Sequence, residues 1–76
     1  MQYGKVLGFM YILREEYSLI LSTMNKTFLN NILGISRNTI YRIIENNKSC
    51  NLSTAYIISK KIFNEDNIEK IFIKIG

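Results

Sequence analysis

The apolar residues at the start of the chain form an almost unbroken pattern. From Lys5 to Ser22 they occupy nearly every side of an ideal helix, with polar interruptions at Arg14–Glu16 and Ser18. This pattern predicts one long N-terminal helix over residues 5–22. The apolar run from Val6 to Leu13 is shorter than the roughly 20 residues that a membrane-spanning helix requires, so we expect no membrane association.

Capping residues divide the middle of the chain into shorter helices. Asn25 is a favoured N-cap for a helix over residues 26–33, and Gly34 suits the left-handed conformation that ends such a helix. Ser36 is a favoured N-cap for the helix that follows. These residues predict two short helices joined by a tight turn over residues 26–45.

Apolar spacing predicts how these two helices pack. Leu29 and Leu33 lie one turn apart on the first helix, Ile40 and Ile43 lie three residues apart on the second, and Ile35 lies in the turn. Packing through these residues sets the helices at a steep angle, which is a helix-turn-helix. The second helix then has an outer face formed by Arg37, Asn38, Tyr41 and Arg42.

A further helix is expected after the loop that ends this unit. Asn51 is a favoured N-cap for a helix over residues 52–63. Apolar residues recur along it at helical spacing, which predicts one buried face. The expected core positions on this helix are Leu52, Ala55, Ile58 and Ile62.

The C-terminal segment allows two interpretations. Asp66 and Glu69 form a capping box, which predicts a short helix over residues 67–73. The tail from Lys70 to Ile75 also alternates between polar and apolar residues, so a terminal strand is the competing interpretation. With the helix preferred, the expected fold is all-α: a compact bundle of about five helices in one domain over residues 1–76.

The composition argues against an enzyme. The chain has one cysteine, Cys50, and no histidine. A zinc site with nitrogen or sulfur ligands, serine–histidine catalysis and cysteine–histidine catalysis are therefore not expected. The six carboxylates resemble solvated surface charge more than a catalytic pair. We expect no metal, no cofactor and no disulfide within the chain, which fits a reducing cytoplasm.

Basic charge is concentrated in the middle of the chain. The net charge is +4. Between Thr23 and Ile62 there are six lysines and arginines against one acidic residue, Glu45, whereas the two flanks hold four basic residues against five acidic ones. This distribution favours a polyanion-binding face near the helix-turn-helix.

The segment from Leu33 to Ile43, LGISRNTIYRI, resembles the helix-turn-helix of the phage lambda repressor and Cro-like family. The similarity continues through the loop and the next helix start, residues 46–55, and covers about residues 24–63. Part of the segment, TIYR, is also similar to site-specific resolvases and tetracycline-repressor relatives, but only the lambda-like family accounts for the loop and helix that follow. Asn30 departs from the family, which usually has alanine there, and fits if its amide finds a backbone partner.

The resemblance implies DNA contacts for particular residues. On the second helix, arginine pairs with guanine, asparagine with adenine, and tyrosine with a thymine methyl or a phosphate. The expected base-reading residues are Arg37, Asn38, Tyr41 and Arg42. The residues expected to contact the DNA backbone are Lys26, Thr27, Ser36, Thr39, Asn47, Lys48 and Ser49.

Apolar residues at both ends of the chain predict a homodimer. A chain of 76 residues has difficulty burying all of them. Two copies would place two recognition helices about one DNA turn apart, which implies a palindromic site. The residues expected at the dimer interface are Phe9, Tyr11, Ile44, Phe72, Ile73 and Ile75.

The sequence therefore predicts a cytoplasmic, sequence-specific regulator that binds double-stranded DNA. A repressor of phage or plasmid type that blocks polymerase from a palindromic operator fits the resemblance best. Two alternatives remain open at this point. One is a small protein-binding inhibitor or antitoxin that reuses the helix-turn-helix, and the other is a recombination or architectural accessory protein that binds DNA.

Overall fold

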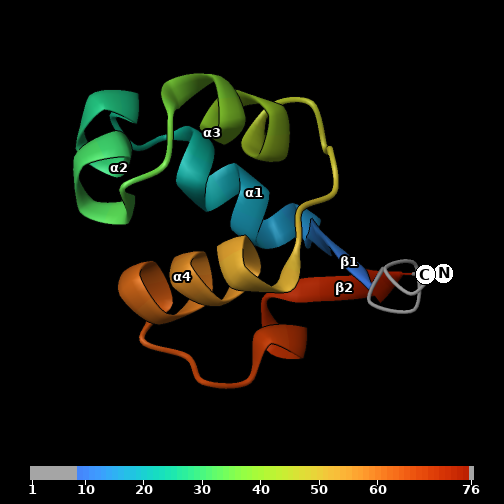
Figure 1. The fold of residues 1–76 in the computed structure, drawn as a ribbon. Coiled ribbons are helices and arrows are strands. Elements are labelled where there is room, and N and C mark those ends of the chain that lie inside the picture. The colour runs from blue at the N-terminus through green and yellow to red at the C-terminus, as the bar shows by residue number, and fades with distance from the viewer. Residues whose placement is uncertain (1–8, 76) are drawn as a thin grey trace, which may run out of the picture.

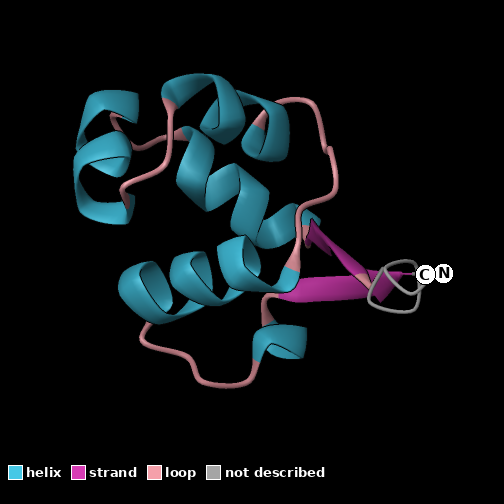
Figure 2. Cartoon of the chain, viewed as in Figure 1, coloured by secondary structure: helices cyan, strands magenta, loops and turns pink. Residues whose placement is uncertain are grey.

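The computed structural model describes residues 9–75. Helices α1 to α4 of this part surround an apolar core, and β1 and β2 form a two-stranded antiparallel sheet at one end (Figures 1 and 2). The expected all-α bundle of about five helices is therefore wrong. In chain order the elements are β1 (Met10–Leu13), α1 (Glu15–Ser22), α2 (Lys26–Leu33), α3 (Arg37–Ile44), α4 (Leu52–Phe63), the 3-10 helix η2 (Ile68–Lys70) and β2 (Phe72–Ile75).

The expected N-terminal helix over residues 5–22 is replaced by a strand and a shorter helix. Residues 10–13 form β1, and α1 begins only at Glu15. Backbone pairing with β2 favours a strand over a helix here, because Met10 pairs with Ile75 and Leu13 pairs with Phe72. Residues 5–8 of the expected helix lie outside the described residues.

The expected helix over residues 67–73 is also wrong. Only Ile68–Lys70 form a helical turn, and the strand interpretation of the tail is confirmed by β2. The cap of the turn is Asn67, whose side-chain oxygen accepts a hydrogen bond from the Glu69 N–H at 3.1 Å. Pairing with β1 supplies backbone partners that a short terminal helix cannot offer.

The capping residues in the middle of the chain behave as predicted. The Asn25 side chain accepts hydrogen bonds from two backbone N–H groups of the first turn of α2. Ser36 accepts one from Thr39 at the start of α3, and Asn51 accepts one at the start of α4. Gly34 ends α2 with φ of 69°, in the left-handed region. Local sequence therefore fixes where these three helices begin.

Most of the expected core positions are buried. Leu29, Ile40, Ala55 and Ile58 are almost completely inaccessible. Ile35 and Ile62 are partly buried and pack against the core, whereas Leu52 is 54% exposed at the first turn of α4. The α1 and α3 helices are joined by the Ser18 hydroxyl, which donates to the Ile44 carbonyl oxygen at 2.7 Å.

Three of the residues expected at a dimer surface lie inside the molecule. Tyr11, Ile44 and Phe72 belong to the core, and Phe72 is completely buried. Tyr11 and Phe72 occupy the inner face of the sheet, and Ile44 faces inward from the end of α3. The reason for assigning them to an interface, exposed apolar surface, therefore does not hold. The remaining three, Phe9, Ile73 and Ile75, are exposed.

Candidate nucleic-acid interface

The outer face of α3 carries the four expected base-reading residues. Arg37, Asn38, Tyr41 and Arg42 are all exposed. Their spacing places them on one side of the helix, since residues three and four apart are neighbours on a helix surface. The opposite side of α3 is buried and holds Ile40, Ile43 and Ile44. The burial pattern thus orients these four side chains toward solvent together.

The turn between α2 and α3 is fixed by two contacts that require particular residues. The Asn30 side-chain amide donates to the Ile35 carbonyl oxygen at 2.6 Å. The Gly34 N–H donates to the Asn30 carbonyl oxygen at 2.9 Å. Asn30 thus has the backbone partner that its amide was expected to need. Both contacts hold α3 in a defined position relative to α2.

Arg37 lies next to the first turn of α2. Its guanidinium donates to the Thr27 hydroxyl at 3.3 Å. The structure therefore places together a residue expected to read bases and a residue expected to contact the DNA backbone. A guanidinium, a hydroxyl and the positive end of the α2 helix dipole form a group suited to a phosphate.

Lys26 lies in a different environment from the one that the sequence suggested. Its ammonium lies 3.1 Å from the Glu45 carboxylate and 5.4 Å from the centre of the Tyr41 ring. Only 13% of the Lys26 side chain is accessible. Lys26 thus neutralises the one acidic residue at the end of the α3 outer face and lies beside Tyr41. The ion pair between Lys26 and Glu45 could not be predicted from the sequence, because no local pattern links residues so far apart in the chain.

The loop after α3 presents the remaining expected backbone contacts. Asn47, Lys48 and Ser49 are all exposed. Asn47 has φ of 57°, and the following N–H, that of Lys48, donates to the Arg42 carbonyl oxygen at 2.9 Å. The far end of the loop is held at Cys50, which exchanges two backbone hydrogen bonds of 2.8 Å with Tyr11. The loop is therefore attached at both ends while its polar side chains face outward.

Ser36 and Thr39 have structural roles at the start of α3. The Ser36 hydroxyl accepts from the Thr39 N–H at 3.3 Å and donates to the Thr39 hydroxyl at 3.0 Å. Ser36 is exposed and Thr39 is half-buried. The Ser36 hydroxyl uses its proton within this pair, whereas the Thr39 hydroxyl keeps a proton that it can donate to an acceptor such as a phosphate.

Cys50 is buried rather than exposed in the loop. Only 7% of the residue is accessible, and burial raises the pKa of its thiol to about 11. The thiol therefore stays protonated at neutral pH and is a poor nucleophile. Its place between the loop and β1 gives it a packing role.

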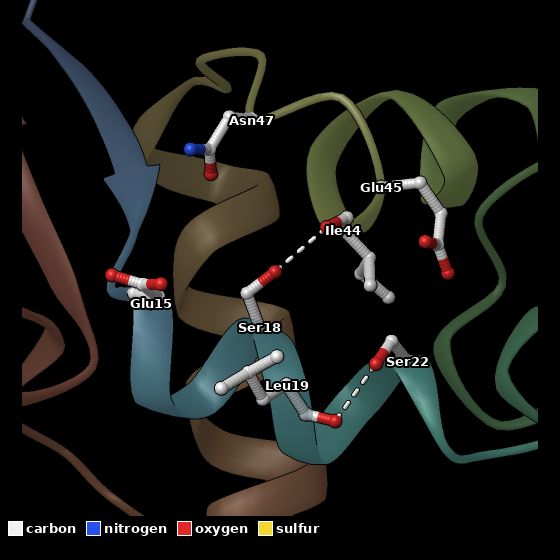
Figure 3. Close-up of a pocket in the computed structure, with 7 residues that line it drawn as sticks. All are labelled: Glu15, Ser18, Leu19, Ser22, Ile44, Glu45 and Asn47. Atoms are coloured by element: carbon white, nitrogen blue, oxygen red, sulfur yellow. Dashed lines mark hydrogen bonds between the residues drawn. The ribbon is translucent and has the colours of Figure 1, made fainter.

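A separate open pocket of about 260 Å³ lies between α1 and the end of α3 (Figure 3). It adjoins the outer face of α3 at Glu45, and its polar lining includes the carboxylates of Glu15 and Glu45. Within residues 9–75, no three histidine, cysteine or acidic side chains gather closely enough to hold a metal ion. The pocket is lined by Glu15, Ser18, Leu19, Ser22, Ile44, Glu45 and Asn47.

None of the helices described between residues 9 and 75 has the length and apolar content needed to cross a bilayer. Comparisons with protein-family models, with curated proteins and with solved structures each found no match to this chain. The arrangement of its own side chains is therefore the basis for a functional assignment.

Proposed function

We propose that this chain is a sequence-specific regulator that binds double-stranded DNA by inserting α3 into the major groove. One observation carries the proposal. The α2–turn–α3 unit presents Arg37, Asn38, Tyr41 and Arg42 together on one exposed helix face. This face combines side chains that hydrogen-bond to base edges with positive charge that attracts phosphates.

The four residues have different roles in this proposal. Arg42 lies in the last turn of α3, and among residues 9–75 its side chain has no hydrogen-bond or ion-pair partner, which leaves it available for the two acceptors of guanine. Asn38 suits adenine by the same two-bond geometry. Tyr41 contributes an aromatic surface and a hydroxyl beside Lys26. Arg37, already bonded to Thr27, is assigned to a phosphate at the start of α2.

The loop after α3 supplies a second group of backbone contacts. Lys48 contributes positive charge there, and Asn47 and Ser49 contribute hydrogen-bond donors. Together with Thr27 they flank the α3 face on both sides, which fixes the register of the helix in the groove without reading sequence. Lys26 is assigned to positioning Tyr41 instead of contacting a phosphate.

The regulator acts as a homodimer on a palindromic operator in this proposal. Two copies related by a two-fold axis place two α3 helices in successive major grooves. A bound dimer of this size represses by excluding polymerase from the promoter. We assign it to the phage or plasmid type of repressor and to the cytoplasm, without an enzymatic activity or a cofactor.

Selection from random duplex DNA tests the proposal. The selected sequences are scored by fluorescence anisotropy at two salt concentrations, with Arg42→Ala as the variant. Lys61→Ala is the matched control, because it removes one positive charge from an exposed position on α4. We expect a two-fold symmetric site whose recognition is relaxed by Arg42→Ala, unchanged by Lys61→Ala and weakened by salt.

Other outcomes of the same experiment point to the alternatives. No enriched motif, with equal effects of the two substitutions, would reject base reading and favour the protein-binding inhibitor or antitoxin. The exposed residues Leu19 and Ile20 of α1 would then be the first surface to test. Enrichment of bent DNA without repression of a reporter promoter would favour the recombination or architectural accessory protein.

A further inference from the structure

One face of the β1–β2 sheet is apolar at every position. The register pairs Met10 with Ile75 and Ile12 with Ile73, so these four side chains share the outer face. Ile73 and Ile75 are 45% and 38% exposed, and Met10 and Ile12 are half-buried. The inner face carries Tyr11, Leu13 and Phe72, which are buried in the core. The inner face also carries Lys74, at its exposed end, so the outer face is the more uniformly apolar of the two, although the inner face is the one that packs on the core.

We propose that this outer face, formed by Met10, Ile12, Ile73 and Ile75, packs face to face against the same face of a second copy of the chain. The two strands extend away from the helices (Figure 1), so a second copy can approach without displacing the α3 face. The loop after α3 ends at Cys50 beside β1, which links the recognition helix to the sheet. The twofold axis would then pass between the two outer faces.

Charge and chemistry favour a second copy as the occupant. No charged side chain lies on the outer face. Lys74 points to the other side, where its ammonium lies 4.4 Å from the centre of the Phe9 ring. An uncharged aliphatic surface is complementary to another uncharged aliphatic surface, and an identical face meets that condition.

Edge-to-edge pairing of β2 with its own copy is the competing arrangement. The N–H and C=O of Tyr11 both bond to Cys50, on the side of β1 away from β2. Because these groups alternate sides along an antiparallel strand, the N–H and C=O of Ile12 point toward β2. On β2, the groups of Phe72 and Lys74 then face the outer edge. Edge pairing would give these N–H and C=O groups hydrogen-bond partners. It would also join the outer faces of the two copies into one larger exposed apolar surface. The edge is also four residues long and carries a lysine, features that discourage such pairing.

The area of the face predicts a weak association in solution. Two strands of four residues cover roughly 130 Å² in projection, whereas a standard interface buries about 800 Å² per partner. Binding of two copies to adjacent half-sites raises their effective concentration and completes the contact. This last step rests on the proposed function, but self-association in solution does not.

Sedimentation equilibrium of the full chain, up to about 0.5 mM, tests self-association. Ile73→Gln removes one side chain from the outer face. Ile20→Gln is the matched control, because Ile20 is 49% exposed on α1. Lys74→Pro removes the N–H that faces the outer edge while leaving the outer face intact. We expect a dimer that Ile73→Gln weakens by about tenfold or more and that the other two substitutions leave unchanged.

The same variants are then titrated on DNA with one half-site or two. We expect the unaltered chain to bind two half-sites cooperatively, and Ile73→Gln to lose cooperativity while keeping its affinity for one half-site. That second result separates this inference from the proposed function. Arg42→Ala, which relaxes operator recognition, should leave the sedimentation result unchanged.

Three outcomes would overturn the inference. A chain that stays monomeric throughout, with Ile73→Gln lowering the melting temperature, would assign the face to another part of the same chain. Equal weakening by Ile20→Gln and Ile73→Gln would move the interface to a different surface. A dimer abolished by Lys74→Pro, with circular dichroism unchanged, would establish edge pairing.

Discussion

The Asn30 side-chain nitrogen lies 2.6 Å from the Ile35 carbonyl oxygen and so joins α2 to the turn that precedes α3. Asn30 is half-buried, and the turn is too short to satisfy this carbonyl by helical hydrogen bonding. The position of the recognition helix therefore depends on one polar side chain at the crossing of two helices.

Substitution of Asn30 with alanine is expected to destabilise the fold. Asn30→Ala leaves a half-buried carbonyl without its partner, so the free energy of unfolding should fall by about 1–2 kcal/mol in urea denaturation. Asn31→Ala is the control, because Asn31 is exposed one residue further along α2. It should be neutral or slightly stabilising, since alanine favours helix. Similar losses in both variants would show that the Asn30–Ile35 hydrogen bond contributes nothing specific.

Gly34 is required for its backbone conformation rather than for space. Its φ is 69°, and a Cβ added there would meet no atom within 4 Å. Gly34→Ala should therefore cost about 1–2 kcal/mol through the left-handed conformation alone. Gly34→Asn should cost less, because asparagine tolerates this region better. Thermal melts of both variants measure the difference, and a loss well above this range would indicate a steric clash.

Removal of the negative charge at Glu45 is expected to strengthen DNA binding. Glu45 lies at the end of the α3 outer face and is paired with Lys26 at 3.1 Å. Glu45→Gln should raise affinity severalfold at low salt, with a smaller gain at high salt, because it removes repulsion from phosphates and releases an ammonium. Glu16→Gln, on the exposed surface of α1, is the control for net charge. Weaker binding by Glu45→Gln would instead show that the ion pair is needed to hold Tyr41.

Arg37 and Arg42 should differ in what they contribute to DNA binding. Arg37 is tied to Thr27 at the start of α2, whereas Arg42 faces outward from the last turn of α3. Arg37→Ala should weaken binding evenly across operator variants and reduce its salt dependence. Arg42→Ala should relax specificity at one base pair, with a discrimination loss of about 1–3 kcal/mol. Anisotropy titrations on single-base operator variants distinguish them, and identical profiles would contradict these roles.

The Cys50 thiol should make stability depend on alkaline pH. Burial holds its pKa at about 11, above that of an exposed thiol. The unfolded chain loses this proton first, so the free energy of unfolding should fall as pH rises from about 9 toward 11. Below that window both states are protonated, and the thiol adds no pH dependence.

Comparison with Cys50→Ala isolates this effect from the tyrosines and lysines that titrate in the same range. The decline in stability should be smaller in the variant, as measured by urea denaturation at several pH values. Parallel curves for the two proteins would mean that the folded chain accepts the thiolate at no cost.

The helices of the middle segment could be predicted because their signals are local. Asn25, Ser36 and Asn51 each accept a hydrogen bond from a backbone N–H two or three residues later, so the capping pattern in the sequence is the interaction itself. Gly34 is also a local signal, because the left-handed conformation that ends α2 is that of the glycine itself. The exposed face of α3 followed from apolar spacing within a single helix.

The strands could not be predicted from the same kind of reasoning. β1 is apolar at all four positions, on the face that packs on the core and on the outer face alike. It therefore lacks the alternation of apolar and polar residues that marks a half-buried strand. Its partner lies at the opposite end of the sequence, and a one-dimensional pattern contains no signal of that pairing. β2 does alternate, but a capping motif competed with it.

Some contacts of the candidate site could not be predicted from local sequence patterns either. The pairs Lys26–Glu45 and Arg37–Thr27 form only when α2 and α3 cross. The residue types on α3 could be predicted, whereas the partners that restrict Arg37 and Lys26 depend on the packed structure. Tertiary contacts, rather than composition, decide which basic side chains remain available to DNA.

The pairing of β1 with β2 brings the two ends of the described chain together and gives the molecule a nearly closed topology. A short linker across the tip of the sheet would convert the two strands into a hairpin. The chain could then be opened at the exposed segment between α4 and η2, residues 64–67, with α2, the turn and α3 still continuous. Such a circular permutant would place both new termini away from the recognition helix.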